Sequence, residues 1–182
     1  ICNKIIDAIK VAAKAPGLKT EYTPVTSQNR IPLIENGTVD LECGSTTNNA
    51  ARQKQVAFAL TTYITEVRMA VKADSGITSI AQLNGKTVAT TTGTTSVQHL
   101  RKHERATGMD FKEVFGKDHS DAFLLLESGR AEAFVMDDNI LAGNISNSKT
   151  PGNYKIVGEV LSVEPIAIMM KKDDAGMAKI AR

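Results

Sequence analysis

Residues 86–106, KTVATTTGTTSVQHLRKHERA, decide the fold class of this chain. A β-rich run at 86–90 is followed by a loop of threonines around Gly93 and then by a helical pattern at 97–106. Another strand is expected at 111–115. A strand, a helix and a second strand in succession are typical of α/β folds with mostly parallel sheets.

The alternation of strands and helices continues in both directions. The elements expected toward the C-terminus are a helix at 122–127, a strand at 131–136, a short helix to about Ser146, and strands at 154–160 and 165–171. Toward the N-terminus, isoleucines recur at helical spacing until Pro16-Gly17, and strands are expected at 20–26, 39–43 and 63–72. The whole chain is therefore predicted to be an α/β protein.

A polar segment, Ala73-Asp74-Ser75-Gly76, separates two such patterns and predicts two lobes. Lobe 1 is expected at residues 1–72 and 162–182, lobe 2 at 76–158, and a two-strand hinge at 73–75 and 159–161.

Composition and charge exclude several classes of function. Hydrophobic residues make up 42% of the 182 residues and charged residues 23%, with a net charge of +2 and no basic block, which argues against nucleic-acid binding. Aromatic residues are 4% and Trp is absent, so a stacking surface for bases or sugars is not expected. The longest apolar runs, such as 166–170, are too short to span a membrane.

Two cysteines, Cys2 and Cys43, permit one disulfide. The sequence by itself favours two buried free thiols, because free cysteine is among the most often buried residues.

Polar loops are expected where ligands bind in open α/β sheets, beyond the carboxyl ends of the strands. They are 44–49 in lobe 1, and 91–96, the loop carrying His119, and Asp137-Asp138 in lobe 2. Their hydroxyl groups and backbone N–H groups suit carboxylate oxygens. Together they predict polar groups on both walls of an interlobe cleft, although loops of this composition commonly only form turns.

Three charged residues refine the expected ligand. Arg30 and Arg52 could each bind a carboxylate through two parallel hydrogen bonds, and Asp137 could accept from an ammonium group. These groups suit an amino acid that carries an additional negative charge.

Six segments resemble one known family, in order and in spacing. They are 26–33 (TSQNRIPL), 42–49 (ECGSTTNN), 93–96 (GTTS), 117–119 (KDH), 126–131 (LESGRA) and 136–138 (MDD). On these segments the chain resembles the solute-binding proteins of bacterial amino-acid ABC importers, extracellular solute-binding protein family 3, on the glutamate/aspartate branch. The likeness covers essentially the whole chain.

The resemblance implies a two-lobed, periplasmic-binding-protein-like (type II) fold in the periplasm. A glutamate or aspartate ligand would bind between the lobes, and a membrane permease would be the partner. The resemblance also implies roles for eight ligand-binding residues. They are Ser45, Thr47, Arg52 and Thr95 for the α-carboxylate, Asp137 for the α-ammonium, and Ser27, Arg30 and His119 for the side-chain carboxylate.

The same family pattern includes parts that the 182 residues do not contain. It implies a strand before Ile1, which would supply another ligand-binding arginine, and helices beyond Arg182. The sequence is therefore interpreted as truncated at both ends, with self-association as a possible consequence. Ala59 stands where the family often has serine, so one polar contact is expected to be lost.

Other classes of function are less well supported by the residues. The nucleophile pattern G-x-S-x-G, the P-loop lysine and the dinucleotide fingerprint are absent, so no enzyme and no cofactor are expected. His99 and His103 have metal-compatible spacing, but the HExxH pattern is lacking and a solvated helix face is the better interpretation. The remaining alternative is a ligand-sensing domain of a receptor or kinase with the same fold.

Overall fold

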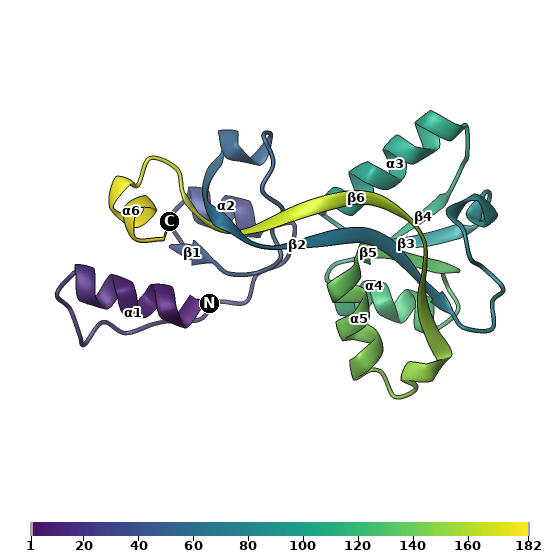
Figure 1. The fold of residues 1–182 in the computed structure, drawn as a ribbon, viewed down its shortest axis with the longest axis horizontal. Helices are drawn as coiled ribbons and strands as arrows, with labels where there is room; N and C mark the ends of the chain where they lie inside the picture. Colours follow the sequence, from purple (N-terminus) through teal and green to yellow (C-terminus); the bar gives the residue numbers. More distant parts are fainter. Residues whose placement is uncertain (1, 182) are drawn as a thin grey trace. The chain divides into compact units, whose positions relative to one another are not determined.

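The computed structural model describes residues 2–181. The chain divides into two compact units, unit 1 (Ile1–Ile64 with Pro165–Arg182) and unit 2 (Thr65–Glu164). Both units contain helices and strands (Figure 1), which confirms the predicted α/β class. Among the described residues, no helix is long and apolar enough to cross a membrane.

Two long strands belong to both units, and the other elements belong to one. The shared strands are β2 (Val56–Lys72) and β6 (Tyr154–Lys171). Unit 1 contains α1 (Cys2–Ala12), α2 (Arg30–Glu35), β1 (Leu41–Glu42), the short 3-10 helix η1 (Arg52–Lys54) and α6 (Ala175–Ala181). Unit 2 contains η2 (Ile80–Leu83), β3 (Thr87–Thr91), α3 (Thr95–Thr107), β4 (Lys112–Gly116), α4 (His119–Glu127), β5 (Ala133–Asp137), α5 (Asp138–Asn147) and η3 (Pro151–Asn153).

The sheet is mixed, with the strand order β1-β6-β2-β5-β3-β4. Parallel pairing, as predicted, joins β3 to β4 and to β5. The pairs β1–β6 and β2–β5 are antiparallel. The three parallel strands lie in unit 2, where the connecting helices α3 and α4 return the chain to the start of the next strand.

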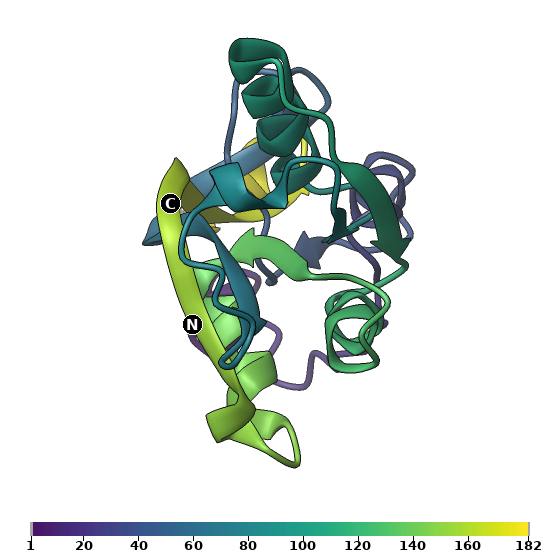
Figure 2. The same cartoon turned by 90° about the vertical axis from the view of Figure 1, so that its right-hand side faces the viewer.

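Helices cover both faces of the parallel strands (Figure 2). Leu100 of α3 packs with Val88 and Val135 in one core cluster. Leu126 of α4 packs with Phe134 in the other, together with residues of α5. Because side chains alternate across a strand, Phe134 and Val135 of β5 supply opposite faces.

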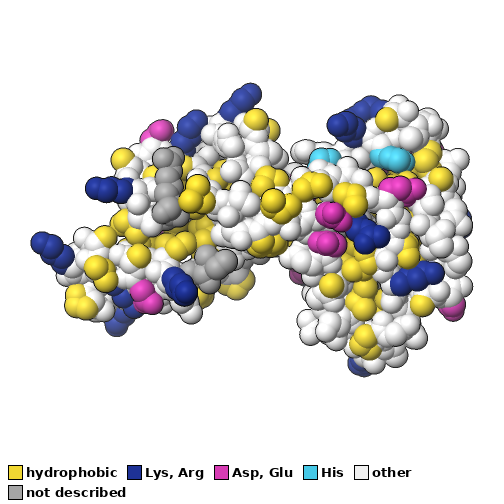
Figure 3. All heavy atoms as spheres, in the orientation of Figure 1, with side chains coloured by type: hydrophobic (Ala, Val, Ile, Leu, Met, Phe, Trp, Pro, Cys, Tyr) yellow, Lys and Arg dark blue, Asp and Glu magenta, His cyan; other side chains and the backbone are white. Residues whose placement is uncertain are grey.

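Unit 1 has a smaller core. Ile168 and Met170 of β6 pack against α1 and α6, and Ile34 of α2 packs against Val56 and Met169. Hydrophobic side chains remain visible on the surface of this unit between α1 and α6 (Figure 3).

Two sequence-based expectations fail locally. The strand predicted at 20–26 is wrong, because among residues 2–181 no backbone hydrogen bond joins 20–25 to a neighbouring strand. The two strands predicted at 154–160 and 165–171 form one strand, β6, whose Gly158 has φ +83°.

The prediction of two free thiols is also wrong. Cys2 at the start of α1 and Cys43 just after β1 form a disulfide, with their Cα atoms 6.1 Å apart. This separation is within the range that disulfides require. The two cysteines are 41 residues apart in the sequence, and the tertiary structure places them next to each other.

Candidate functional site

In unit 1 the loop that follows β1 is attached to β6. Thr47 forms an isolated antiparallel bridge with Ile166. The Asn48 amide donates to the Pro165 carbonyl at 2.8 Å, and the Ala167 amide donates to the Thr46 carbonyl at 3.2 Å. Thr46 and Thr47 are buried, so the loop is a fixed part of the unit although its sequence is typical of a turn.

Arg52 lies against this loop. Its Nη1 donates to the Thr47 carbonyl at 3.0 Å, and its amide donates to Asn49 Oδ1 at 2.9 Å. The side chain is 9% exposed, which is unusual for arginine. The structure thus brings Thr47 and Arg52 into direct contact, and Ser45 lies half-buried in the same loop.

Glu42, a buried carboxylate that the sequence did not single out, lies beneath the loop. It is 5% exposed, and its Oε2 accepts from the Thr46 hydroxyl at 2.7 Å. Its position on a two-residue strand explains why the sequence pattern did not separate it from an ordinary surface glutamate.

Ser27 and Arg30 lie at the start of α2. The Thr26 amide donates to Asn29 Oδ1 at 2.7 Å, and the Asn29 amide donates to Thr26 Oγ1 at 3.2 Å. This reciprocal pair closes the turn that contains Ser27 immediately before the helix, whose N-cap residue Asn29 makes no side-chain capping bond. Arg30, the first helical residue, is 5% exposed.

In unit 2 the predicted residues gather at one edge of the sheet. The parallel strands pair Thr91 with Gly116 at their carboxyl ends, and β5, which ends at Asp137, runs parallel beside β3. Thr95 follows β3, and His119 follows β4. Because the carboxyl ends of parallel strands meet at one edge, Thr95, His119 and Asp137 converge there.

The loop from β3 to α3 has a definite shape. Gly93 has φ +80°, a conformation that favours glycine, and the Thr94 hydroxyl donates to the Thr91 carbonyl at 2.8 Å. Thr95 is then the first residue of α3 and is 6% exposed. The backbone N–H groups of a first helical turn have no partner within the helix and favour an anion.

His119 is oriented by the neighbouring loop. Its Nδ1 lies 2.9 Å from the Thr91 hydroxyl, and its helix α4 is capped by Asp118, which accepts from the Asp121 amide at 2.9 Å. Gly116 makes this turn possible, since a Cβ there would lie 2.2 Å from the Ala122 backbone nitrogen.

Asp137 and Asp138 have different environments. Asp137 is 4% exposed and occupies the N-cap position of α5 without a side-chain capping bond. Asp138 accepts from the Thr65 hydroxyl and from the amides of Glu66 and Asn139. Burial raises the pKa of Asp138, but these hydrogen bonds outweigh it and hold the pKa below its usual range.

Two further residues at the Thr95 end of α3 were not assigned to the site by the sequence. Glu164 of β6 is 2% exposed. Its Oε1 lies 2.5 Å from His99 Nε2, and its Oε2 accepts from the Thr95 hydroxyl at 3.1 Å. No local motif marks this contact, because Thr95 and Glu164 are 69 residues apart in the sequence.

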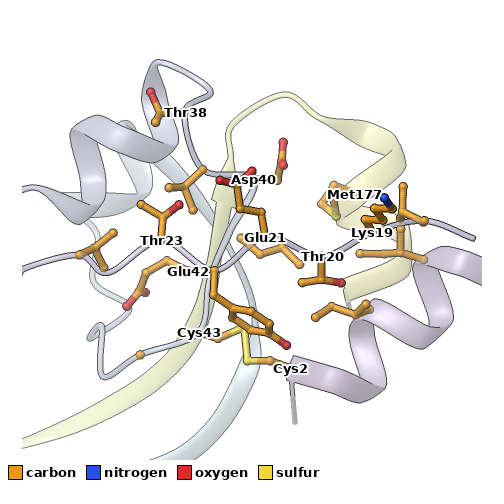
Figure 4. Close-up of a pocket in the computed structure, with 18 residues that line it drawn as sticks. Cys2, Lys19, Thr20, Glu21, Thr23, Thr38, Asp40, Glu42, Cys43 and Met177 are labelled. Carbon is orange, nitrogen blue, oxygen red and sulfur yellow. A yellow bond between two sulfur atoms is a disulfide. The ribbon is translucent and has the colours of Figure 1, made fainter.

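A separate cavity of about 680 Å³ lies within unit 1 (Figure 4). Its walls come from α1, from segment 18–25 and from 38–44, and the Cys2–Cys43 disulfide lies at its edge. None of the eight predicted ligand-binding residues lines it. Within residues 2–181 no group of three or more His, Cys, Asp or Glu side chains could hold a metal ion.

Residues 5–181 match the bacterial extracellular solute-binding proteins, family 3. The glutamate/aspartate import solute-binding protein of Escherichia coli (strain K12) is 46% identical over 98% of this chain. The L-glutamate/L-aspartate-binding protein of Pseudomonas aeruginosa is 43% identical over 97% of this chain, and the glutamine-binding protein of Geobacillus stearothermophilus is 32% identical over 88%. The chain spans 59% of the length of each of these relatives.

Solved structures show the same likeness. A periplasmic binding protein from Brucella ovis with glutathione bound superposes with a TM-score of 0.84 at 26% identity, covering 98% of this chain and 58% of that protein. The arginine-bound form of truncated ArgBP from T. maritima has a TM-score of 0.82 at 27% identity, with 97% and 81% covered.

Proposed function

The chain belongs to the bacterial extracellular solute-binding proteins, family 3, and on that basis we propose that it binds glutamate or aspartate for delivery to an ABC importer. Family membership confirms the predicted resemblance and the periplasmic-binding-protein-like fold. The family is one of solute-binding proteins and not a class of enzymes.

The observation that carries this proposal is the burial of charged side chains in both units. Arg30 and Arg52 are 5% and 9% exposed in unit 1, and Asp137 is 4% exposed in unit 2. Charged side chains are rarely buried unless another group pairs with them, because desolvating a charge is costly. At the predicted positions, two guanidinium groups and one carboxylate match the two carboxylates and one ammonium of an acidic amino acid. Among the described residues, the two other buried carboxylates, Glu42 and Glu164, each accept from a threonine hydroxyl of their own unit.

The proposed contacts follow the charges of the ligand. Ser45, Thr47, Arg52 and Thr95 bind the α-carboxylate, Asp137 accepts from the α-ammonium, and Ser27, Arg30 and His119 bind the side-chain carboxylate. The ligand stabilises the conformation in which residues of both units contact it, because its affinity for that conformation is higher. That conformation is the one offered to the membrane permease, in the periplasm.

Isothermal titration calorimetry tests this function directly. We expect saturable binding of L-glutamate and L-aspartate to the 182-residue chain, and weaker or no binding of L-glutamine. A neutral amide would leave a buried arginine without its carboxylate, which costs on the order of a few kcal/mol. Absence of binding to either acid would contradict the proposal for this chain.

Single substitutions locate the site. Arg52→Ala and Asp137→Ala should each weaken binding by roughly tenfold or more, because a buried ligand charge loses its partner. Lys54→Ala is the matched control, since Lys54 is an exposed cation on the same short helix as Arg52. Equal affinities for Arg52→Ala and Lys54→Ala would remove Arg52 from the site.

A further inference from the structure

Glu164 connects the start of α3 to strand β6 within unit 2. Its carboxylate is 2% exposed and contacts two side chains of α3, with Oε1 at 2.5 Å from His99 Nε2 and Oε2 at 3.1 Å from the Thr95 hydroxyl. Thr95 and His99 are four residues apart and therefore share one face of the helix. The two oxygens of one carboxylate thus contact successive turns of α3.

We propose that Glu164 is a positioning residue for ligand binding, which acts by holding the Thr95 hydroxyl so that Thr95 meets the ligand through its backbone N–H. His99 supports this role by fixing the orientation of the Glu164 carboxylate. The proposal rests on the proposed function, because it concerns the α-carboxylate contact assigned to Thr95.

Hydrogen-bond chemistry assigns the donors. An ionised carboxylate only accepts hydrogen bonds, and a threonine hydroxyl carries a single proton. The proton of the Thr95 hydroxyl is therefore donated to Glu164, and the hydroxyl oxygen is left as an acceptor. An acceptor does not bind a ligand carboxylate, so the donor that Thr95 offers is its backbone N–H at the start of α3.

His99 completes the arrangement in the same way. Its Nε2 faces Glu164 Oε1, so this ring nitrogen is the donor of the pair. With Oε1 bonded to His99, Oε2 remains directed at Thr95. The His99 side chain is 25% exposed and the Glu164 side chain 3% exposed, so the bond is partly shielded from water, which strengthens it.

The experiment measures the dissociation constant for L-glutamate in Thr95→Val, Glu164→Gln and the double variant. Each single variant should weaken binding by about tenfold, the loss of one hydrogen bond to a charged group. Because both substitutions act on the same bond, which Thr95→Val removes and Glu164→Gln weakens by replacing a charged acceptor with a neutral one, the double variant should bind no more weakly than the weaker single variant. Thr95→Ser, which keeps the hydroxyl, should bind like the unmodified chain.

Two further variants separate positioning from simple loss of structure. His99→Leu should weaken binding in the same direction as Glu164→Gln, and it serves in place of Glu164→Gln if that variant does not fold. Arg101→Gln is the control, because Arg101 lies on the same helix but its side chain forms an ion pair with Glu113 of β4, at 2.8 Å, and not with Glu164. Its affinity for glutamate should be unchanged.

The outcomes are distinct. If the unmodified chain binds neither glutamate nor aspartate, the proposed function fails and this inference fails with it. If the unmodified chain binds glutamate, but Glu164→Gln and His99→Leu bind it equally well, the inference alone fails. A loss confined to Thr95→Val would likewise overturn it, since the hydroxyl would then contact the ligand itself.

Discussion

Unit 1 and unit 2 are stabilised in different ways. Among the described residues, each of the two core clusters of unit 1 has three buried side chains, whereas those of unit 2 have eleven and ten. Unit 2 packs helices on both faces of its parallel strands, and unit 1 has an open cavity and one disulfide. Where few side chains are buried, a disulfide contributes a larger share of the folding stability. Where many are buried, close packing contributes most of it.

The positions of the predicted site residues follow the same contrast. In unit 1 Ser45 and Thr47 lie in a loop attached to β6 by a bridge and two backbone hydrogen bonds, and Arg30 and Arg52 lie at the starts of the short helices α2 and η1. In unit 2 the predicted residues lie at strand ends and helix starts, where the sheet itself determines their positions. We therefore expect perturbations of unit 1 to be local and those of unit 2 to be cooperative.

The largest expected effect comes from breaking the disulfide. Replacing Cys2 and Cys43 with serine should destabilise unit 1 by about 4 kcal/mol, the loop-closure entropy for a separation of 41 residues. Denaturant unfolding measures the loss, and hydrogen exchange of β3 amides should be unchanged. A reducing agent should reproduce the effect in the unmodified chain and have no effect on the serine variant. Unchanged stability in both cases would contradict a structural disulfide.

The next effect concerns the packing of unit 2. Gly116→Ala should destabilise the chain by about 3 kcal/mol, because its Cβ would lie 2.2 Å from backbone that cannot give way. Gly143→Ala is the matched control within the same unit, since apart from its chain neighbours and the backbone of its own helix no atom lies within 4 Å of a Cβ there, and alanine favours the helix by roughly 0.5–1 kcal/mol. If both variants had the same melting temperature, the close packing of β4 against α4 would be disproved.

The smallest effect is a pH dependence in unit 2. The pKa of Asp138 is held below its usual range in the folded chain, so its contribution is present above the unfolded pKa of about 4 and is lost as pH falls through the folded pKa. We expect less than about 1 kcal/mol, because Asp138 is partly exposed. Asp138→Asn should flatten the loss of stability below about pH 4 in denaturant titrations.

Thr65→Val should change this dependence in the same direction as Asp138→Asn, since it removes a hydrogen bond to the same carboxylate. A pH profile identical in all three chains would show that Asp138 does not contribute.

Much of unit 2 was predictable from residue patterns. Strands at 86–90 and 131–136 and the helix at 97–106 correspond to β3, β5 and α3, because each has its own periodicity and turn residues. The convergence of Thr95, His119 and Asp137 also followed, since parallel strands place their carboxyl ends at one edge. Their roles toward a ligand remain predictions.

Less of unit 1 was predictable. Segment 20–26 has an alternating pattern but forms no strand, because a strand exists only when a neighbour accepts its hydrogen bonds. Cys2 and Cys43 were expected to be free, because nothing in the local sequence states which residues meet across a fold.

The sequence by itself determined the family, the α/β class and the candidate ligand residues, since short motifs and periodicities are local properties. Only the tertiary structure decided that Cys2 forms a disulfide with Cys43, that Arg52 donates to the Thr47 carbonyl and that Glu164 accepts a hydrogen bond from the Thr95 hydroxyl. Two of these contacts, Cys2–Cys43 and Thr95–Glu164, join residues 41 and 69 positions apart, and the third depends on a buried loop whose sequence is that of an ordinary turn. Burial and pairing of this kind arise from packing, which no local pattern encodes.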